Sequence, residues 1–165
     1  PLDIMTYQYP SRKQFDEHGI QIVFLGWFFS DWSLVDNGMY AVTEGLDLRS
    51  DTASNTGDLK GVTALDEDWV TLNQMIKYYK FGFGRASDYL NEEIRAGRIK
   101  RIDAITLAEK YDGCCSSEYI SGFCDYIEIT VEEFWVQVRA SVNRNLFDVD
   151  KSGVIKRKFT VGVGL

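Results

Sequence analysis

The sequence has few of the residue types from which metal and redox sites are built. Its 165 residues include one histidine, His18, and three cysteines, Cys114, Cys115 and Cys124. His18 is remote in sequence and adjacent cysteines lack the C-x2-C spacing of zinc sites, so three thiolate ligands are the weaker interpretation and free structural thiols the favoured one. We expect no metal site among these residues, and the odd number of cysteines fits a reducing cytoplasm.

Positive charge is also scarce. The chain has 18 lysines and arginines against 25 acidic residues, a net charge of −7. This balance argues against a nucleic-acid-binding protein, because such domains carry a basic face or stripe. No segment has the length and purity of a transmembrane helix or a signal peptide. Because 45% of the residues are hydrophobic and 14% aromatic, we expect a well-packed cytoplasmic protein without a membrane span.

The first third of the chain resembles the end of an α/β domain. Residues 11–18 predict a short helix that ends at Gly19, and the apolar run Ile20-Gln-Ile-Val-Phe-Leu25 predicts a buried parallel strand. The following loop, residues 27–32, would then lie at the carboxyl end of the strand, where open α/β sheets bind ligands. A helix over residues 34–44 comes next.

A polar stretch, residues 49–58, has the composition of a surface loop or linker. We place a domain boundary there, so that residues 1–57 form the C-terminal part of an α/β domain and residues 58–165 a helical C-terminal region with a short extended tail. The fold class is therefore mainly α.

Helical patterns dominate after the polar stretch. Apolar residues recur at helical spacing and end at glycines or turn residues, which predicts helices from the acidic turn 66–68 to Gly82, over 86–97, over 102–112 and over 117–126. Thr130 and Glu133 form a capping box that begins one more helix.

The tail contains a partial imitation of a calcium loop. Asp148, Asp150, Ser152 and Gly153 have the spacing of its first half, but the glutamate that should complete it is replaced by Phe159. A polar turn between two short extended segments is the favoured interpretation.

Cations and glycines gather where two helices should meet, in Lys77-Tyr-Tyr-Lys-Phe-Gly-Phe-Gly-Arg85. Glycines let backbone amides turn toward a ligand, and a helix N-terminus favours negative charge. We therefore predict an anion site for phosphate, and its candidate contacts are Lys77, Lys80, Gly82, Gly84 and Arg85. The alternative is that the glycines only end one helix and turn the chain, with the cations in solvent.

Several strings resemble one known family, the N-acetyl sugar amidotransferases of surface-polysaccharide and LPS biosynthesis, which have a PP-loop ATP pyrophosphatase domain. The strings are Phe24-Leu-Gly-Trp27, Tyr78-Tyr-Lys-Phe-Gly-Phe-Gly-Arg85, Asp88-Tyr-Leu-Asn-Glu-Glu-Ile-Arg95, Gly97-Arg98-Ile99, Lys110-Tyr-Asp-Gly113 and Phe123-Cys-Asp-Tyr126. The similarity extends over nearly the whole chain.

The resemblance implies an ATP-dependent enzyme, with Mg, that converts the acetamido group of a nucleotide-activated N-acetyl sugar to an acetamidino group. A separate glutaminase would supply the ammonia. The family's Ser-Gly-Gly-x-Asp-Ser phosphate loop does not occur in this sequence, so the chain resembles a C-terminal portion that we expect to be inactive alone. A homo-oligomer is a further expectation, because an uncovered apolar face seeks a partner.

Other candidate residues follow from the same reading, although no catalytic residue can be named. Asp88 and Arg95 could orient a substrate or pair with other side chains. Trp27 and Trp32 could stack on a base or sugar, whereas Trp69 and Trp135 fit a core. Most of Tyr78, Tyr79, Phe81 and Phe83 should be core or wall residues. An alternative function is a helical module that docks the glutaminase without doing chemistry.

Overall fold

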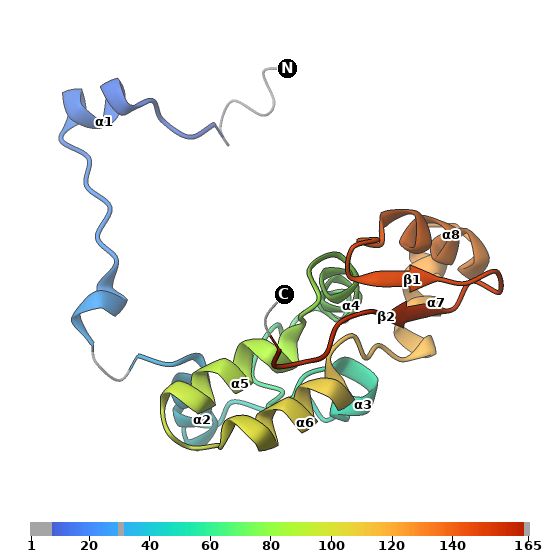
Figure 1. Ribbon diagram of the computed structural model, residues 1–165. Helices are drawn as coiled ribbons and strands as arrows, with labels where there is room; N and C mark the ends of the chain where they lie inside the picture. Colours follow the sequence, from blue (N-terminus) through green and yellow to red (C-terminus); the bar gives the residue numbers. More distant parts are fainter. Residues whose placement is uncertain (1–7, 30–31, 164–165) are drawn as a thin grey trace. The chain divides into compact units, whose positions relative to one another are not determined.

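The structure, a computed structural model, describes residues 8–29 and 32–163 (Figure 1). It divides into two compact units, residues 1–32 and residues 33–165. The first unit contains helix α1, Arg12–His18, and a short 3-10 helix, η2, Leu25–Phe28. Gly19 ends α1 in the left-handed conformation, as the sequence predicts, and Ser11 and Gln14 form a capping box that was not predicted.

The strand predicted over residues 20–25 is not formed. Residues 20–24 have no regular secondary structure, and Leu25 begins η2. Ile22, Val23 and Phe24 are exposed, with 54%, 58% and 70% of their surface accessible. A strand requires a neighbour to pair its backbone groups, and within residues 8–29 and 32–163 the only strands are the two of the C-terminal hairpin. The prediction was wrong because an apolar run cannot supply that neighbour.

The second unit is mainly helical, in agreement with the predicted fold class. Its helices are α2 (Leu34–Thr43), α3 (Ala53–Thr56), α4 (Val70–Phe81), α5 (Arg85–Arg95), α6 (Arg101–Tyr111), α7 (Ser117–Tyr126) and α8 (Val131–Ser141). The capping box of α8 is present as predicted. Helix α4 begins only at Val70, so the acidic residues 66–68 precede it rather than form its first turn.

Two groups of helices share this unit. Helices α5 and α6 lie side by side and enclose Ala86, Leu90, Ala104 and Ala108 (Figure 1). Helices α4, α7 and α8 pack around a second cluster that includes Leu72, Met75, Ile120, Cys124, Phe134 and Val138. Trp69 and Trp135 pack against this cluster, which confirms their predicted place in the core.

The tail forms an antiparallel hairpin of β1, Phe147–Val149, and β2, Ile155–Arg157. Asp150 stabilises the turn, because its Oδ1 atom accepts hydrogen bonds from the backbone N–H groups of Ser152 and Val154. A hydrogen bond from the Ser152 hydroxyl, the nearby Lys156 ammonium and the Val154 N–H lower the pKa of Asp150. The predicted polar turn between two extended segments is therefore confirmed.

The polar stretch 49–58 is more ordered than its composition suggested. It contains α3, and Thr56 is buried with only 3% of its surface accessible. The carbonyl of Asn55 accepts from the Ser116 N–H, and the Arg49 N–H donates to the carbonyl of Gly61. The stretch is therefore a packed loop of the second unit, and the domain boundary near residue 57 stays a prediction.

Phe147 anchors the hairpin to α4. It is 1% exposed and makes edge contacts with Tyr78, Tyr79 and Phe159 at centroid distances of 5.2, 5.7 and 5.6 Å. We predict that Phe147→Ala lowers the free energy of unfolding by about 3 to 5 kcal/mol, measured by chemical denaturation, because it leaves a cavity among these rings. Val154→Ala, at a half-exposed position of the same hairpin, should change it by less than about 0.5 kcal/mol. Equal effects would contradict the anchoring role.

Candidate functional site

Helix α4 ends at Gly82, which has a φ of 81° and donates its N–H to the carbonyl of Tyr78 at 2.8 Å. A Cβ atom at this position would lie 3.2 Å from the Phe159 ring and 3.3 Å from Leu146. Gly82 is thus a helix cap that also allows close packing against the hairpin. These contacts account for the residue without a ligand.

Gly84 has a different reason to lack a side chain. Its φ of −126° is open to any residue, but a Cβ atom would lie 2.9 Å from Oδ1 of Asp112. Asp112 follows the last residue of α6, and its carboxylate accepts hydrogen bonds from the backbone N–H and the hydroxyl of Ser87 in the first turn of α5. The glycine therefore makes room for a carboxylate that caps α5.

This cap bears directly on the predicted phosphate site. The N-terminus of a helix attracts anions through its unpaired N–H groups and its dipole. Here a carboxylate of the protein already binds the Ser87 N–H, at 3.1 Å. The negative charge of this carboxylate disfavours a second anion at the same helix end, and the predicted anion contacts stay predictions.

Lys77 and Asp88 form an ion pair, with 2.6 Å between Nζ and the carboxylate oxygen. The Lys77 ammonium also lies 4.6 Å from the centroid of the Phe83 ring. Asp88 therefore pairs with another side chain, as one of the two sequence interpretations expected. The pair holds the last turns of α4 against the start of α5.

The other predicted cations are placed differently. Lys80 is exposed in the last turn of α4, and Arg85, half-buried, begins α5 and makes no hydrogen bond or ion pair within the described part of the chain. Arg95 lies at the opposite end of α5, about 15 Å along the axis. The structure thus pairs Lys77 with Asp88 and places Lys80 and Arg85 on the two sides of the turn between α4 and α5, with Arg95 at the far end of α5.

The four aromatic residues of the string form one buried pair and one exposed pair. Tyr78 and Tyr79 pack in the core beside Phe147, as predicted. Most of the four were expected to be core or wall residues, but Phe81 and Phe83 are 62% and 44% exposed, with their ring centroids 6.3 Å apart. The glycines beside them take the inward positions, so the rings have no place in the core.

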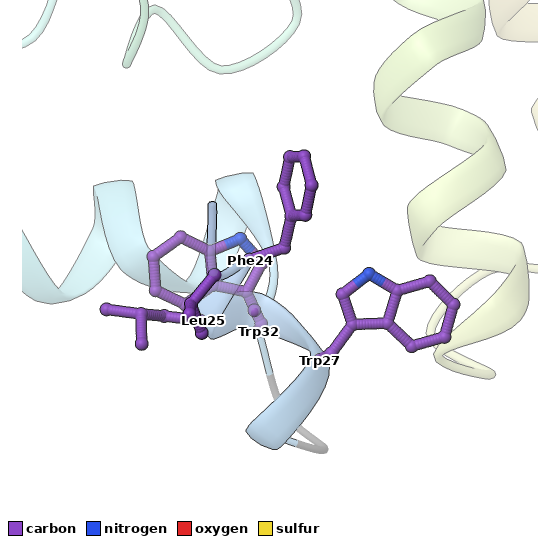
Figure 2. Close-up of a pocket in the computed structure, with 6 residues that line it drawn as sticks. Phe24, Leu25, Trp27 and Trp32 are labelled. Atoms are coloured by element: carbon purple, nitrogen blue, oxygen red, sulfur yellow. The ribbon is translucent and has the colours of Figure 1, made fainter. Parts of the chain in front are cut away.

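Trp27 and Trp32, the candidate stacking residues, belong to the first unit. They line a shallow hollow with Val23, Phe24, Leu25 and Gly26 (Figure 2). Trp32 packs beside Gly26, whereas Trp27 is 89% exposed and points away from Trp32 (Figure 2). The two indoles do not face one another, so they form no sandwich for a planar ligand.

Sequence reasoning missed a polar network around Tyr89. The Tyr89 ring is fully buried, and its hydroxyl lies 2.9 Å from the Thr63 hydroxyl and 3.4 Å from Oδ2 of Asp58. Oδ1 of Asp58 accepts from the N–H groups of Lys60 and Gly61, both at 2.8 Å. Burial raises the pKa of Tyr89 to about 12. This network ties the loop after α3 to α5.

The cysteines are free thiols: Cys124 is buried, and Cys114 and Cys115 are partly buried. Burial raises the pKa of each, that of Cys115 to about 12, so the thiols stay protonated near neutral pH. Within residues 8–29 and 32–163, no three acidic, histidine or cysteine side chains gather as metal ligands.

A comparison of the sequence with known protein families finds a match. The family model described as "LPS biosynthesis protein WbpG-like, C-terminal domain" matches residues 57–160. The chain belongs to this family. The WbpG-like match confirms the resemblance at the level of lipopolysaccharide biosynthesis and covers the whole string from Lys77 to Arg85. A search of curated proteins finds no match. In the part of the chain that the structure describes, no helix is long and apolar enough to cross a membrane.

The Asp112 cap predicts a coupled effect of two substitutions. Gly84→Ala should lower the free energy of unfolding by about 1 to 3 kcal/mol, because its methyl group would overlap the Asp112 carboxylate. The same change should cost less in an Asp112→Ala background, where that carboxylate is missing. Chemical denaturation of the four proteins of this double-mutant cycle measures the coupling, and additive effects would contradict the close contact.

The buried Tyr89 predicts a loss of stability at high pH. Its pKa rises from 10.0 in the unfolded chain to about 12 in the fold, so the native state keeps a proton that the unfolded state releases. The contribution of Tyr89 to the free energy of unfolding should therefore be constant below about pH 10 and fall as the pH rises from 10 to 12. In Tyr89→Phe this fall should be smaller, as measured by denaturation across that range. An unchanged slope would contradict the assignment.

Proposed function

We propose that the chain is the C-terminal part of an ATP-dependent N-acetyl sugar amidotransferase. The observation that carries the proposal is the match to the WbpG-like C-terminal domain over residues 57–160, together with the amidotransferase strings of the sequence. The packing of two of these strings supports it. Gly84 of the first string makes room for Asp112 of the second, and Tyr78 packs on Gly113.

The reaction would replace the oxygen of a sugar acetamido group by nitrogen. The amide oxygen attacks the α-phosphorus of ATP and pyrophosphate leaves; ammonia then attacks the activated carbon, and AMP departs with the original oxygen. ATP is needed because an amide oxygen is a poor leaving group. A glutaminase would supply the ammonia, and Mg would accompany ATP.

The residues of this chain do not fit the main ATP site. The sequence has no Ser-Gly-Gly-x-Asp-Ser loop, and the N-terminus of α5 already binds Asp112. The contribution of these residues is therefore the binding of the sugar nucleotide, through side chains near the turn between α4 and α5. The glycines Gly82 and Gly84 act through the shape of that turn.

The native protein that carries this chain tests the proposal. With ATP, Mg, ammonium and a nucleotide-activated N-acetyl sugar, we expect pyrophosphate release that depends on the sugar. Mass spectrometry should show a product in which an imino group replaces one oxygen. Arg85→Ala should lower kcat/KM for the sugar nucleotide by about tenfold or more, because a charge-assisted contact contributes 1.5 kcal/mol or more. Lys151→Ala, in the exposed hairpin turn, is the matched control.

Two results would count against this function. The first is ATP turnover that does not respond to any N-acetyl sugar nucleotide. The second is binding of a glutaminase without binding of nucleotides or sugar nucleotides, which would favour the docking module instead.

A further inference from the structure

Two aromatic rings and two cationic side chains of the Lys77–Arg85 string are not required by the packing of the helices. Gly82 and Gly84 make room for neighbours, Lys77 pairs with Asp88, and the two tyrosines pack in the core. The remaining residues are Lys80, Phe81, Phe83 and Arg85, which we call the turn patch. They lie in or beside the three-residue connection Gly82–Gly84 between α4 and α5, within the second unit.

The rings of the turn patch are unequally accessible. Lys77 lies 4.6 Å from the centroid of Phe83 and covers part of that ring, so Phe83 is 44% exposed. Phe81 is 62% exposed and tilted by 41° from Phe83. Because of the tilt the rings do not form one flat platform. Phe81 is the ring that offers a face to a planar ligand, and Phe83 supports its edge.

The charge around these rings is locally positive in an acidic protein. The three cations Lys77, Lys80 and Arg85 stand against two carboxylates, Asp88 and Asp112, an excess of one positive charge, whereas the whole chain has a net charge of −7. Arg85 makes no ion pair or hydrogen bond within residues 8–29 and 32–163. A planar guanidinium of this kind suits phosphate oxygens. An occupant of the turn patch should therefore be anionic.

The size of the turn patch favours a small ligand. A stable protein interface buries about 800 Å² on each partner, more than the four side chains of one turn provide. A nucleotide combines a planar base with charged phosphates on the scale of one aromatic ring and two cations. The Asp112 carboxylate binds the Ser87 N–H, and its negative charge repels a second anion from this end of α5, so we expect the phosphates to be bound by side chains.

We propose that the turn patch binds the nucleoside diphosphate part of the sugar nucleotide, with the base stacked on Phe81 and the phosphates facing Arg85 and Lys80. The identity of the ligand rests on the function proposed above. The assignment separates the base, which Phe81 would hold, from the phosphates, which the cations would hold.

Isothermal titration calorimetry of the 165-residue chain tests this separation with three probes: uridine diphosphate, guanosine diphosphate and inorganic pyrophosphate. We expect Phe81→Ala to weaken the binding of a nucleoside diphosphate about tenfold, as stacking contacts do, and to leave pyrophosphate binding unchanged. Phe81→Trp should restore the affinity. Arg85→Ala should weaken all three probes. Tyr40→Ala and Lys151→Ala, at exposed positions elsewhere, should change none.

Three results would overturn the inference: no binding of either nucleoside diphosphate, equal loss of pyrophosphate and nucleotide affinity in Phe81→Ala, or a change of oligomeric state in Phe81→Ala without a change in nucleotide affinity. Its failure can be told apart from that of the proposed reaction. If the native enzyme amidinates the sugar and its nucleotide affinity does not change in Phe81→Ala, the binding role of the turn patch is wrong and the proposed reaction is supported. If nucleotide binding depends on Phe81 but no amidination occurs, the binding role of the turn patch is supported and the proposed reaction is wrong.

Discussion

The contact of the Asp112 carboxylate with the first turn of α5 determines the geometry of the candidate site. It joins the end of α6 to the start of α5, so that the helical hairpin is closed at both ends, by the loop at Gly97 and by this cap. At the same point Tyr78 of α4 packs on Gly113, where a Cβ atom would overlap the tyrosine ring. Three helices therefore meet at two adjacent residues, and the turn between α4 and α5 has little freedom to move.

This contact also constrains how the site can attract anions. A helix N-terminus offers oriented N–H groups without a net charge, whereas an arginine or a lysine offers a full charge on a mobile side chain. At α5 the Asp112 carboxylate already binds the Ser87 N–H and stabilises the helix. Recognition of an anion then depends on Arg85 and Lys80. Side chains of this kind bind phosphate through long-range attraction, which salt screens, more than through a preformed cradle.

The sequence predicted the features that depend on neighbouring residues. The capping box at Thr130 and the helix ends at Gly19 and Gly82 follow from short patterns, and the structure contains them. Contacts between residues far apart in the sequence could not be predicted from local patterns. Asp112 and Ser87 are 25 residues apart, and nothing in either local pattern links them. The failed strand at residues 20–25 has the same cause, because its backbone would have to pair with another strand.

The form of the signature string follows from an alternation of positions. Gly82 has the left-handed conformation that ends α4, and Gly84 is extended ahead of α5. Gly82 and Gly84 face inward, against Phe159 and Asp112, where a Cβ atom would lie 3.2 and 2.9 Å from its neighbours. Phe81 and Phe83, which flank Gly82, are both exposed, so their rings lie on the outer side of the same turn. Their exposure results from the close packing of the turn, and one short segment thereby serves both the stability of the helices and the surface on which a ligand can bind.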